Sequence, residues 1–300
     1  MNIAKVRKFL MEWVLPPRGI RAVCFVMSRV LPCRSTLALH RKRSKRLFVL
    51  VNGPSLSRDL ERYGEDIATS DRLTVNFMGT TELYEKIRPT MYLLADPAYF
   101  SALDELNEGL RAKVTALKEA LREKTSWDME LIVPDCARNS DFVQSVLANK
   151  RISVVCYSTC VPRPMDSEDM YGWLRNWYAP PTLNVLGTAT YLGICWRYET
   201  VVLAGADMSF HAVMRVEQDT NRLYREDEHY YGKEKLYMYC DRNEKTPRHL
   251  ADALLDTSQV FGWFERLRML ADYAGVRVVN ASSFSWIDAF ERPQMGDGGR

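Results

Sequence analysis

The sequence predicts an α/β protein built on a doubly wound, mainly parallel sheet. Short, β-rich apolar runs alternate with longer segments of helical periodicity along most of the 300 residues, as in a parallel sheet covered on both faces. Several of these runs end in Asn or Asp. A content of 47% hydrophobic and 26% charged residues allows a sizeable core and argues against a disordered or disulfide-stapled chain.

A strongly basic segment precedes the first predicted strand. Residues 1–46 hold twelve Lys or Arg and one acid, a net charge of +11, whereas the rest of the chain carries −8. Apolar residues interleave with these charges, and Pro16-Pro17 would divide the segment into one or two short amphipathic helices that can lie on an anionic membrane surface. A solvated tail, a helix packed on the body and a nucleic-acid contact are alternatives, although no nucleic-acid-binding module accompanies the charge. Arginines interrupt the apolar region, which argues against a spanning helix and a secretory signal.

The strands are predicted from short apolar runs that end at turn-forming residues. The first run stops at Asn52-Gly53-Pro54 and the third at Asp96-Pro97, while the most strand-like run leads into Asp207. The predicted strands lie at 47–51, 72–76, 91–95, 131–134, 152–156, 200–207 and 276–280.

The helices are predicted from apolar residues at three- and four-residue spacing. The clearest is 103–124, with apolar residues at 103, 106, 110, 114, 117 and 121. The predicted helices lie at 56–63, around 81–85, and at 103–124, 187–198 and 254–274. A polar, aromatic stretch from 208 to about 250 interrupts the alternation and is predicted to be a lid, and a glycine-rich tail ends the chain.

Four polar residues stand at the ends of four separate apolar runs: Asn52, Asn76, Asp96 and Asp207. Ligands of doubly wound sheets bind outside the carboxyl ends of the strands, so these residues predict a ligand cleft. The seven cysteines form no CxxC pair, which suggests neither a zinc site nor a disulfide framework and fits a reducing, cytoplasmic setting.

The motifs next to these strands resemble those of bacterial sialyltransferases of glycosyltransferase family 42, within a wider group that includes pterin pyrophosphokinase-like proteins. No GxGxxG fingerprint and no GxxxxGK[ST] phosphate loop is present. The resemblance covers about residues 47–285 and rests on five motifs in order: Asn52-Gly53-Pro54-Ser55-Leu56, Asn76-Phe77, Asp96-Pro97, the run from Tyr198 to Asp207, and Glu228-His229-Tyr230-Tyr231-Gly232.

The resemblance implies a Rossmann-like, GT-A-like fold that binds a CMP-activated sugar and transfers it with inversion and without a metal ion. It implies a nucleotide-binding domain at 47–207, a lid or acceptor region at 208–250, a completing helix and strand at 251–290 and a flexible tail at 291–300. The donor-binding residues that it implies are Asn52, Gly53, Pro54, Ser55, Asn76, Asp96, Asn184, Gly187, Thr188 and Asp207. Asp96 stands where the sialyltransferases have Asn, and the family motif around Asn184 is not reproduced in full.

His229 is the candidate general base, with Tyr230 and Tyr231 beside it as donors to the leaving phosphate. Histidine titrates near neutral pH and suits the deprotonation of an acceptor hydroxyl. In the sialyltransferases, the histidine usually assigned as base matches the place of Lys233, so His211 or another base remains open. Further tyrosines in the lid, Tyr224, Tyr237 and Tyr239, supply hydroxyls or pack the lid, and Arg248 and His249 either meet an anionic substrate or begin a solvated helix.

These observations favour transfer of sialic acid, or a related keto-sugar acid such as Kdo, from its CMP form to a cell-surface glycan or lipid-linked acceptor. The expected enzyme uses no cofactor beyond its CMP-sugar substrate and lies in the cytoplasm, peripheral on the inner face of the cytoplasmic membrane. One alternative is an ATP- and magnesium-dependent pyrophosphokinase-like enzyme with Asp96 and Asp207 as ligands. Another is a non-catalytic nucleotide-sugar binding protein, and a homo-oligomer is left open.

Overall fold

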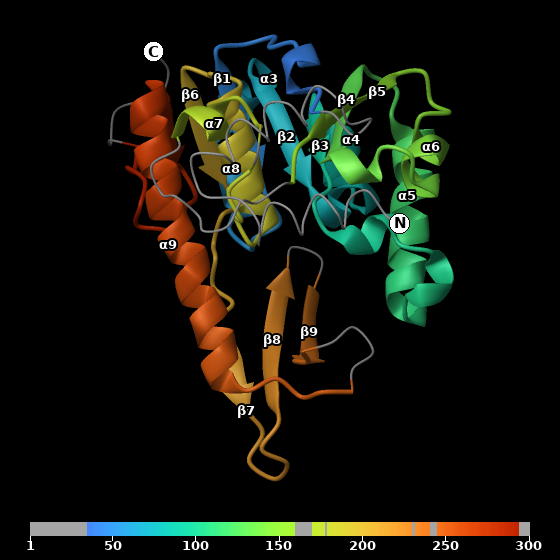
Figure 1. Ribbon diagram of the computed structural model, residues 1–300, viewed down its shortest axis with the longest axis vertical. Helices are drawn as coiled ribbons and strands as arrows, with labels where there is room; N and C mark the ends of the chain where they lie inside the picture. Colours follow the sequence, from blue (N-terminus) through green and yellow to red (C-terminus); the bar gives the residue numbers. More distant parts are fainter. Residues whose placement is uncertain (1–34, 160–169, 178, 230–231, 241–244, 294–300) are drawn as a thin grey trace, which may run out of the picture.

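A seven-stranded, wholly parallel sheet forms the centre of the protein. The computed structural model describes residues 35–159, 170–177, 179–229, 232–240 and 245–293 of the chain. The strand order β10-β6-β1-β2-β3-β4-β5 confirms the predicted doubly wound α/β class (Figure 1). The strands are β1 Arg46–Leu50, β2 Asp71–Val75, β3 Met91–Leu93, β4 Met129–Pro134, β5 Ile152–Tyr157, β6 Thr200–Ala204 and β10 Arg277–Asn280.

Helices cover both faces of this sheet (Figure 1). One face packs against α3 Leu56–Ala68, α4 Leu83–Ile87, α5 Glu108–Lys124 and α6 Asp141–Val146, and the other against α7 Met170–Leu174, α8 Val185–Cys195 and α9 Leu250–Ala274. Strand β1 shows why its sequence is continuously apolar: Leu47 and Val49 enter one core and Phe48 and Leu50 the other.

The predicted helix at 103–124 is shorter than its apolar spacing suggested. Residues Leu103–Glu105 form a separate 3-10 turn, and α5 begins at Glu108 because the Asn107 side chain accepts a hydrogen bond from the backbone N–H of Leu110 at 2.9 Å. An amide oxygen at this position satisfies a donor that the first helical turn leaves unpaired, so it defines the start of the helix. The short helices α6 and α7 were not predicted.

The region predicted as a lid folds into a second, three-stranded antiparallel sheet. Its order is β7-β8-β9, with β7 Met214–Val216, β8 Leu223–His229 and β9 Gly232–Tyr237. In Figure 1 this hairpin sheet extends beyond the carboxyl ends of the parallel strands, and the first half of α9 runs beside it. The lid region therefore faces the edge of the parallel sheet where a ligand is expected.

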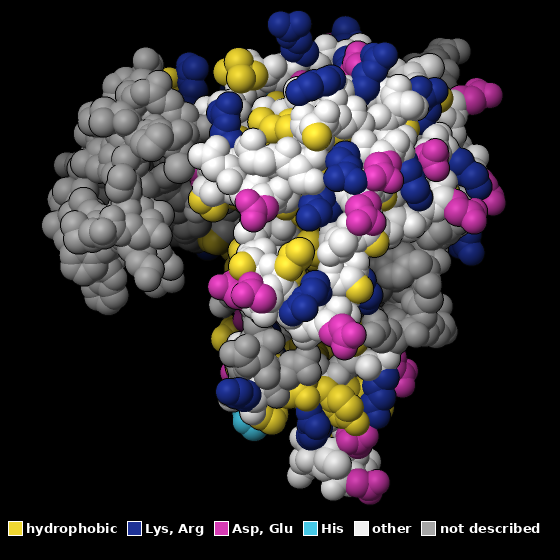
Figure 2. All heavy atoms as spheres, turned by 90° about the vertical axis from the view of Figure 1, so that its right-hand side faces the viewer, with side chains coloured by type: hydrophobic (Ala, Val, Ile, Leu, Met, Phe, Trp, Pro, Cys, Tyr) yellow, Lys and Arg dark blue, Asp and Glu magenta, His cyan; other side chains and the backbone are white. Residues whose placement is uncertain are grey.

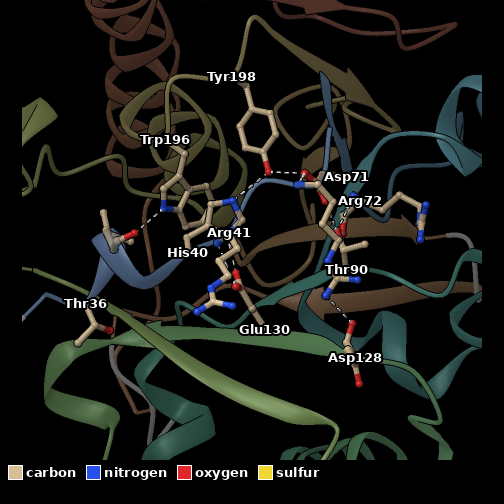
Figure 3. A network of polar contacts seen from close by, with 12 residues as sticks. Thr36, His40, Arg41, Asp71, Arg72, Thr90, Asp128, Glu130, Trp196 and Tyr198 are labelled. Atoms are coloured by element: carbon tan, nitrogen blue, oxygen red, sulfur yellow. Dashed lines mark hydrogen bonds and ion pairs between the residues drawn. The ribbon is translucent and has the colours of Figure 1, made fainter. Parts of the chain in front are cut away.

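Residues 35–45, which the sequence analysis assigned to the basic amino-terminal segment, pack on the α/β body. Thr36 donates its backbone N–H to the Cys156 carbonyl at 2.7 Å and accepts the Cys156 N–H on its hydroxyl at 2.8 Å. The His40 ring stacks at 4.2 Å on Trp196, and its Nε2 lies 2.9 Å from the Tyr198 hydroxyl (Figure 3). The α/β body therefore includes this stretch, ahead of the boundary expected at residue 46.

A buried carboxylate continues this network to the start of β2. Asp71 is 1% exposed, and its Oδ2 accepts hydrogen bonds from the backbone N–H groups of Arg43 and Ser44 and from the Tyr198 hydroxyl (Figure 3). His40 Nδ1 also contacts Glu130. Hydrogen bonds thus hold residues 40–44 against the amino ends of the parallel strands, just before the chain enters β1.

The two ends of the chain lie partly outside the described residues. The amphipathic helices expected around Pro16-Pro17 fall within residues 1–34, which the structure does not describe. At the other end, the expected tail at 291–300 begins with packed residues, since the Glu291 carbonyl accepts the Asn280 N–H at 2.9 Å. Among the described residues, no helix combines the length and apolar character needed to cross a membrane.

Candidate functional site

A large cavity lies at the carboxyl edge of the parallel sheet. Its volume is about 1380 Å³, and the ends of β1, β2, β3, β5 and β6 contribute to its wall, together with the start of α8 and part of the hairpin sheet. The sheet order places β6 beside β1, so the chain reverses its winding direction between these two strands. Such a switch point is where doubly wound sheets bind ligands.

Asn52 presents an unsatisfied polar atom beside this cavity. It follows β1 directly and lines the cavity, and its side-chain Oδ1 is buried without a hydrogen-bond partner among the described residues. A buried acceptor without a partner costs free energy, which a bound donor group would recover. The motif resemblance implies that Asn52 binds the donor, and a position beside the cavity is compatible with that role.

Gly53 allows the turn after β1 to approach β6 closely. A Cβ atom at this position would lie 2.1 Å from Asp207 Oδ2 and 2.2 Å from the Gly205 carbonyl oxygen. The Gly53 N–H donates to that same carbonyl at 3.0 Å. Gly53 and Pro54 line the cavity, so the close approach of two strand ends shapes its wall.

Asp207 and Ser55 bond to each other inside the protein. The Ser55 hydroxyl donates to Asp207 Oδ2 at 2.6 Å, and the Ser55 N–H lies 3.2 Å from Asp207 Oδ1. Asp59 Oδ2 accepts the Gly205 N–H at 2.8 Å, next to this pair. Burial raises the pKa of Asp207, and the nearby Asp59 charge adds to the increase while the Ser55 bonds oppose it. Asp207 therefore holds the first turn against β6, a structural role that sequence reasoning did not give it.

Asn76 adopts a left-handed backbone conformation at the end of β2. Its φ of 52° is stabilised through Tyr92, whose hydroxyl accepts the Gly79 N–H at 2.7 Å and donates to the Asn76 carbonyl. Left-handed residues in this structure include two further cavity-lining positions, Leu183 and Met208, where the conformation is costly for bulky side chains. Backbone strain of this kind clusters at ligand-binding sites.

Asp96 caps a short turn at the cavity edge. Its side chain accepts the Ala98 N–H at 2.8 Å at the start of the 3-10 helix Pro97–Phe100. The Asp96 residue is exposed and lines the cavity. Its role as a donor-binding residue stays a prediction.

The start of α8 forms another part of the cavity wall. Asn184 caps this helix through the Gly187 N–H at 2.6 Å, and the hydroxyls of Thr182 and Thr188 lie 2.7 Å apart. Asn184 and Thr188 line the cavity, whereas Gly187 serves as the capped backbone donor behind it. The first turn of α8 thus comes to the cavity edge, as does the turn that leads into α3.

One of the predicted catalytic residues, His229, lies at the end of a strand of the hairpin sheet. His229 is the last residue of β8, where it pairs with Gly232, but its side chain, Tyr230 and Tyr231 lie outside the described part of the structure. Arg225, which pairs with Leu236, lines the cavity together with that residue. His229 lies four residues beyond Arg225, at a strand position of the same parity.

The other lid residues that the sequence singled out are not among the residues that line the cavity. Tyr224, Tyr237 and Tyr239 interleave with Lys235 and Arg222, with Arg222 stacked 4.3 Å from the Tyr237 ring centroid. Arg248 pairs with Asp256 on α9, and the His211 ring packs on Trp286. These tyrosines therefore pack within the hairpin sheet. This is one of the two roles that the sequence analysis gave them, the other being to supply hydroxyls to the site.

The cavity residues that sequence reasoning missed include three with large side chains that can donate hydrogen bonds. Tyr157 ends β5, Lys113 comes from α5 and Arg225 from β8. Burial raises the pKa of Tyr157, which therefore stays a neutral donor. Tyr157 follows an apolar run just as Asn52 does, so its position at the end of a strand was the available signal.

The described residues contain no group of three or more His, Cys, Asp or Glu side chains that could hold a metal ion. Four cysteines fall within the described residues, and all four are free thiols: Cys136, Cys156, Cys195 and Cys240.

No protein-family profile and no curated protein matches this sequence. Among solved structures, the chain is similar to the MAf glycosyltransferase from Magnetospirillum magneticum AMB-1, at 14% identity and a TM-score of 0.45. The match covers 85% of this chain and 34% of that chain, so the protein spans about a third of the length of the matched structure.

Proposed function

We propose that this protein is a glycosyltransferase that moves a sialic acid, or a related keto-sugar acid such as Kdo, from a CMP-activated donor to a glycan or lipid-linked acceptor. The observation that carries the proposal is the cavity at the β1–β6 switch point, where Asn52, Asn76 and Asn184 line one space large enough for a nucleotide and a sugar. The motif resemblance described above supplies the identity of the donor.

The wall of the cavity offers groups suited to a nucleotide. The buried, unpaired Oδ1 of Asn52 can accept from an amino group of the base or from a ribose hydroxyl. The first turn of α8 and the turn leading into α3 border the same space, and helix amino termini favour phosphate groups. Lys113 and Arg225 add positive charge to the wall.

The proposed reaction breaks the bond between the sugar and the CMP phosphate while the acceptor hydroxyl attacks from the opposite face. The departing phosphate gains negative charge, which hydroxyl and amide donors can stabilise. The proton of the acceptor hydroxyl passes to a base, for which we propose His229. The path of β8 toward the parallel sheet and the position of Arg225 support this choice (Figure 1).

A nucleotide titration tests the donor class. Thermal unfolding is followed with CMP, CDP, UDP, GDP and ATP, each with and without magnesium, because a ligand that binds the native state raises its stability. We expect stabilisation by CMP or CDP without magnesium. Stabilisation by ATP with magnesium alone would favour the pyrophosphokinase-like alternative and contradict the proposal.

Asn52→Ala separates binding from folding. Since Asn52 Oδ1 has no hydrogen-bond partner among the described residues, its removal is expected to leave the unfolding midpoint near that of the wild type while CMP binding weakens roughly tenfold. Asn139→Ala changes an exposed asparagine outside the cavity and is the matched control. Equal CMP affinity in the two variants would remove Asn52 from the site.

His229→Ala tests the base. With CMP-sialic acid and CMP-Kdo as donors, we expect turnover to fall roughly a hundredfold or more while CMP affinity is kept. His249→Ala, at an exposed position before α9, is the control. A wild-type protein that binds the donor and never releases CMP would instead be a binding protein.

We also propose a peripheral position on the inner face of the cytoplasmic membrane. The support is the basic, partly apolar sequence of residues 1–34 together with exposed basic residues that follow it on the body: Arg41, Lys42, Arg43 and Lys45. Figure 2 shows Lys and Arg side chains gathered over the end of the molecule where the strands begin.

A further inference from the structure

Two half-exposed aromatic side chains lie beside the cavity on the segment that follows β10. Phe284 is 49% exposed and Trp286 is 48% exposed, and their ring centroids are 6.3 Å apart with the planes nearly perpendicular. The backbone N–H of Trp286 donates to the Asp207 carbonyl at 3.0 Å. The pair therefore lies next to the end of β6, where the cavity wall begins.

The segment that carries these aromatics is held rigidly. Asn280 is fully buried, and its Nδ2 donates to Ser285 Oγ at 3.0 Å and to the Ile287 carbonyl at 3.1 Å. Ser285 Oγ donates to the Ala206 carbonyl at 2.6 Å, and Arg292 contacts the Ser285 carbonyl. The side chains are thus exposed on an ordered, hydrogen-bonded segment, and a ligand would meet them already in place.

His211 extends the aromatic surface toward the cavity. Its ring centroid lies 4.7 Å from Trp286 and 5.8 Å from Phe261, edge to face with both. The preceding residues Ser209 and Phe210 line the cavity. The aromatic surface is therefore continuous with the cavity wall through residues 209–211.

This surface also offers polar atoms. Within the described residues, neither the Trp286 indole N–H nor the His211 ring makes a hydrogen bond. Aromatic rings with free N–H or nitrogen atoms match a pyranose ring, which has an apolar face of C–H groups and a rim of hydroxyls. A purely apolar partner would leave these polar atoms unpaired.

We propose that Phe284, Trp286 and His211 form a saccharide-binding subsite in which the acceptor sugar stacks on Trp286. The inference rests on the proposed function and gives the acceptor its place: the sugar lies over the aromatic surface with its reacting hydroxyl directed past residues 209–210 into the cavity. The chemical class of the ligand is a pyranoside with free hydroxyls.

Saturation-transfer NMR on the full chain tests the subsite. The probes are lactose and methyl β-D-galactoside, with the open-chain polyol glucitol as the ligand control. We expect transfer to the ring C–H protons of the two pyranosides and none to glucitol. Absence of transfer to both pyranosides overturns the proposal.

Variants locate the binding. Trp286→Ala and Phe284→Ala are expected to weaken pyranoside binding roughly threefold to tenfold, and Trp286→Tyr to retain most of it. Tyr273→Ala removes an aromatic side chain that is 59% exposed, near the far end of α9, and is the matched control. Equal binding in the wild type, Trp286→Ala and Phe284→Ala overturns the proposal.

Two further measurements separate this inference from competing explanations. CMP affinity is expected to be unchanged in Trp286→Ala, and pyranoside binding is expected to be unchanged in Asn52→Ala. A wild-type protein that binds the pyranosides but not CMP would therefore count against the proposed function alone. Sedimentation velocity compares the mass of the wild type and Trp286→Ala. A change from dimer to monomer would assign this surface to a second copy of the chain and overturn the subsite.

Discussion

Gly53 occupies a position that no larger residue fits. A Cβ there would approach Asp207 Oδ2 to 2.1 Å and the Gly205 carbonyl to 2.2 Å, so Gly53→Ala must separate β1 from β6. We expect it to lower the free energy of unfolding by more than about 2 kcal/mol, as other severe steric changes do. The measurement is urea denaturation.

Gly64 provides the control within the same helix-and-turn unit. It lies in α3, where an added Cβ would have no neighbouring atom within 4 Å, so Gly64→Ala is expected to stabilise the protein by about 0.5–1 kcal/mol. If the two alanine variants had similar unfolding free energies, the close approach at Gly53 would not determine the turn.

Burial of Asp207 predicts a specific pH dependence. Its pKa is raised in the folded protein, which means that the folded state holds the Asp207 proton more tightly than the unfolded state does. The stability that this proton contributes is present at low pH and is lost as the pH rises through the folded pKa. Asp207→Asn carries no such proton. The stability of the wild type relative to this variant is therefore expected to fall as the pH rises above about 4.

Ser55→Ala tests the cause of this pH dependence. The Ser55 hydroxyl and N–H lower the pKa of Asp207 against the effect of burial, so loss of the hydroxyl is expected to raise that pKa further. In a urea denaturation series, the decline in stability is then expected to extend to higher pH. Parallel pH profiles for the wild type and Asp207→Asn would contradict the assignment.

These strand-end residues also show what the sequence could predict. Asn52 and Asn76 follow apolar runs, and since parallel strands end at one edge, their shared cavity followed from the alternation of elements. The same pattern could not show which of the acids at the cavity also bond within the protein, so the bonds of Asp207 to Ser55 and of Asp96 to Ala98 were not foreseen. Hydrogen-bond partners of this kind depend on tertiary contacts, which the spacing of residues along the sequence does not reveal.

The hairpin sheet is stabilised at its far end by Glu217. Its carboxylate accepts hydrogen bonds from the Thr220 hydroxyl, from Lys235 Nζ at 2.9 Å and from the Tyr237 hydroxyl at 2.9 Å. The Thr220 bond, followed by those from Lys235 and Tyr237, lowers the pKa of Glu217 to about 2. One side chain thus connects the β7–β8 turn to β9.

Glu217→Gln is expected to accelerate amide hydrogen exchange in β8 and β9. Because the folded pKa is lowered, the contribution of Glu217 is present above its unfolded pKa of about 4.3 and is lost as the pH falls toward 2. The difference between the wild type and the variant should therefore shrink over that range. Glu265→Gln breaks an exposed pair on α9 and should leave hairpin exchange unchanged; faster exchange in that control would point to a nonspecific effect.

Sequence reasoning predicted a lid in this region but, as with the short helices α6 and α7, it did not predict the strands of the hairpin sheet. In the β8–β9 pair, a charged residue lies opposite an apolar one, as Arg225 does opposite Leu236. The strict alternation of apolar and polar residues that identifies a half-buried strand is therefore absent. The parallel strands were recognised because both of their faces are buried and read as continuous apolar runs. A small sheet that lines a cavity needs no such run, since part of its surface faces that cavity instead of a packed core.

The basic amino end of the body and the cavity lie at opposite edges of the parallel sheet. Leu39 is 65% exposed next to Arg41 and Lys42, which fits a surface that contacts anionic lipid. Strands of five or six residues separate this edge from the cavity by about 17–20 Å. An acceptor that reaches the cavity from a membrane bound in this way must extend at least that far from the lipid, which favours a glycan over a short lipid-linked sugar.

Vesicle sedimentation tests this orientation. The double variant Arg41→Gln/Lys42→Gln is expected to bind phosphatidylglycerol vesicles about thirtyfold more weakly, from about 1 kcal/mol for each charge. Arg215→Gln/Lys245→Gln removes equal charge near the hairpin, where α9 exposes Leu250, Leu254 and Leu255, and is expected to bind as the wild type does. If only Arg215→Gln/Lys245→Gln lost vesicle binding, the cavity side of the protein would face the bilayer. A short lipid-linked sugar would then be the better acceptor class.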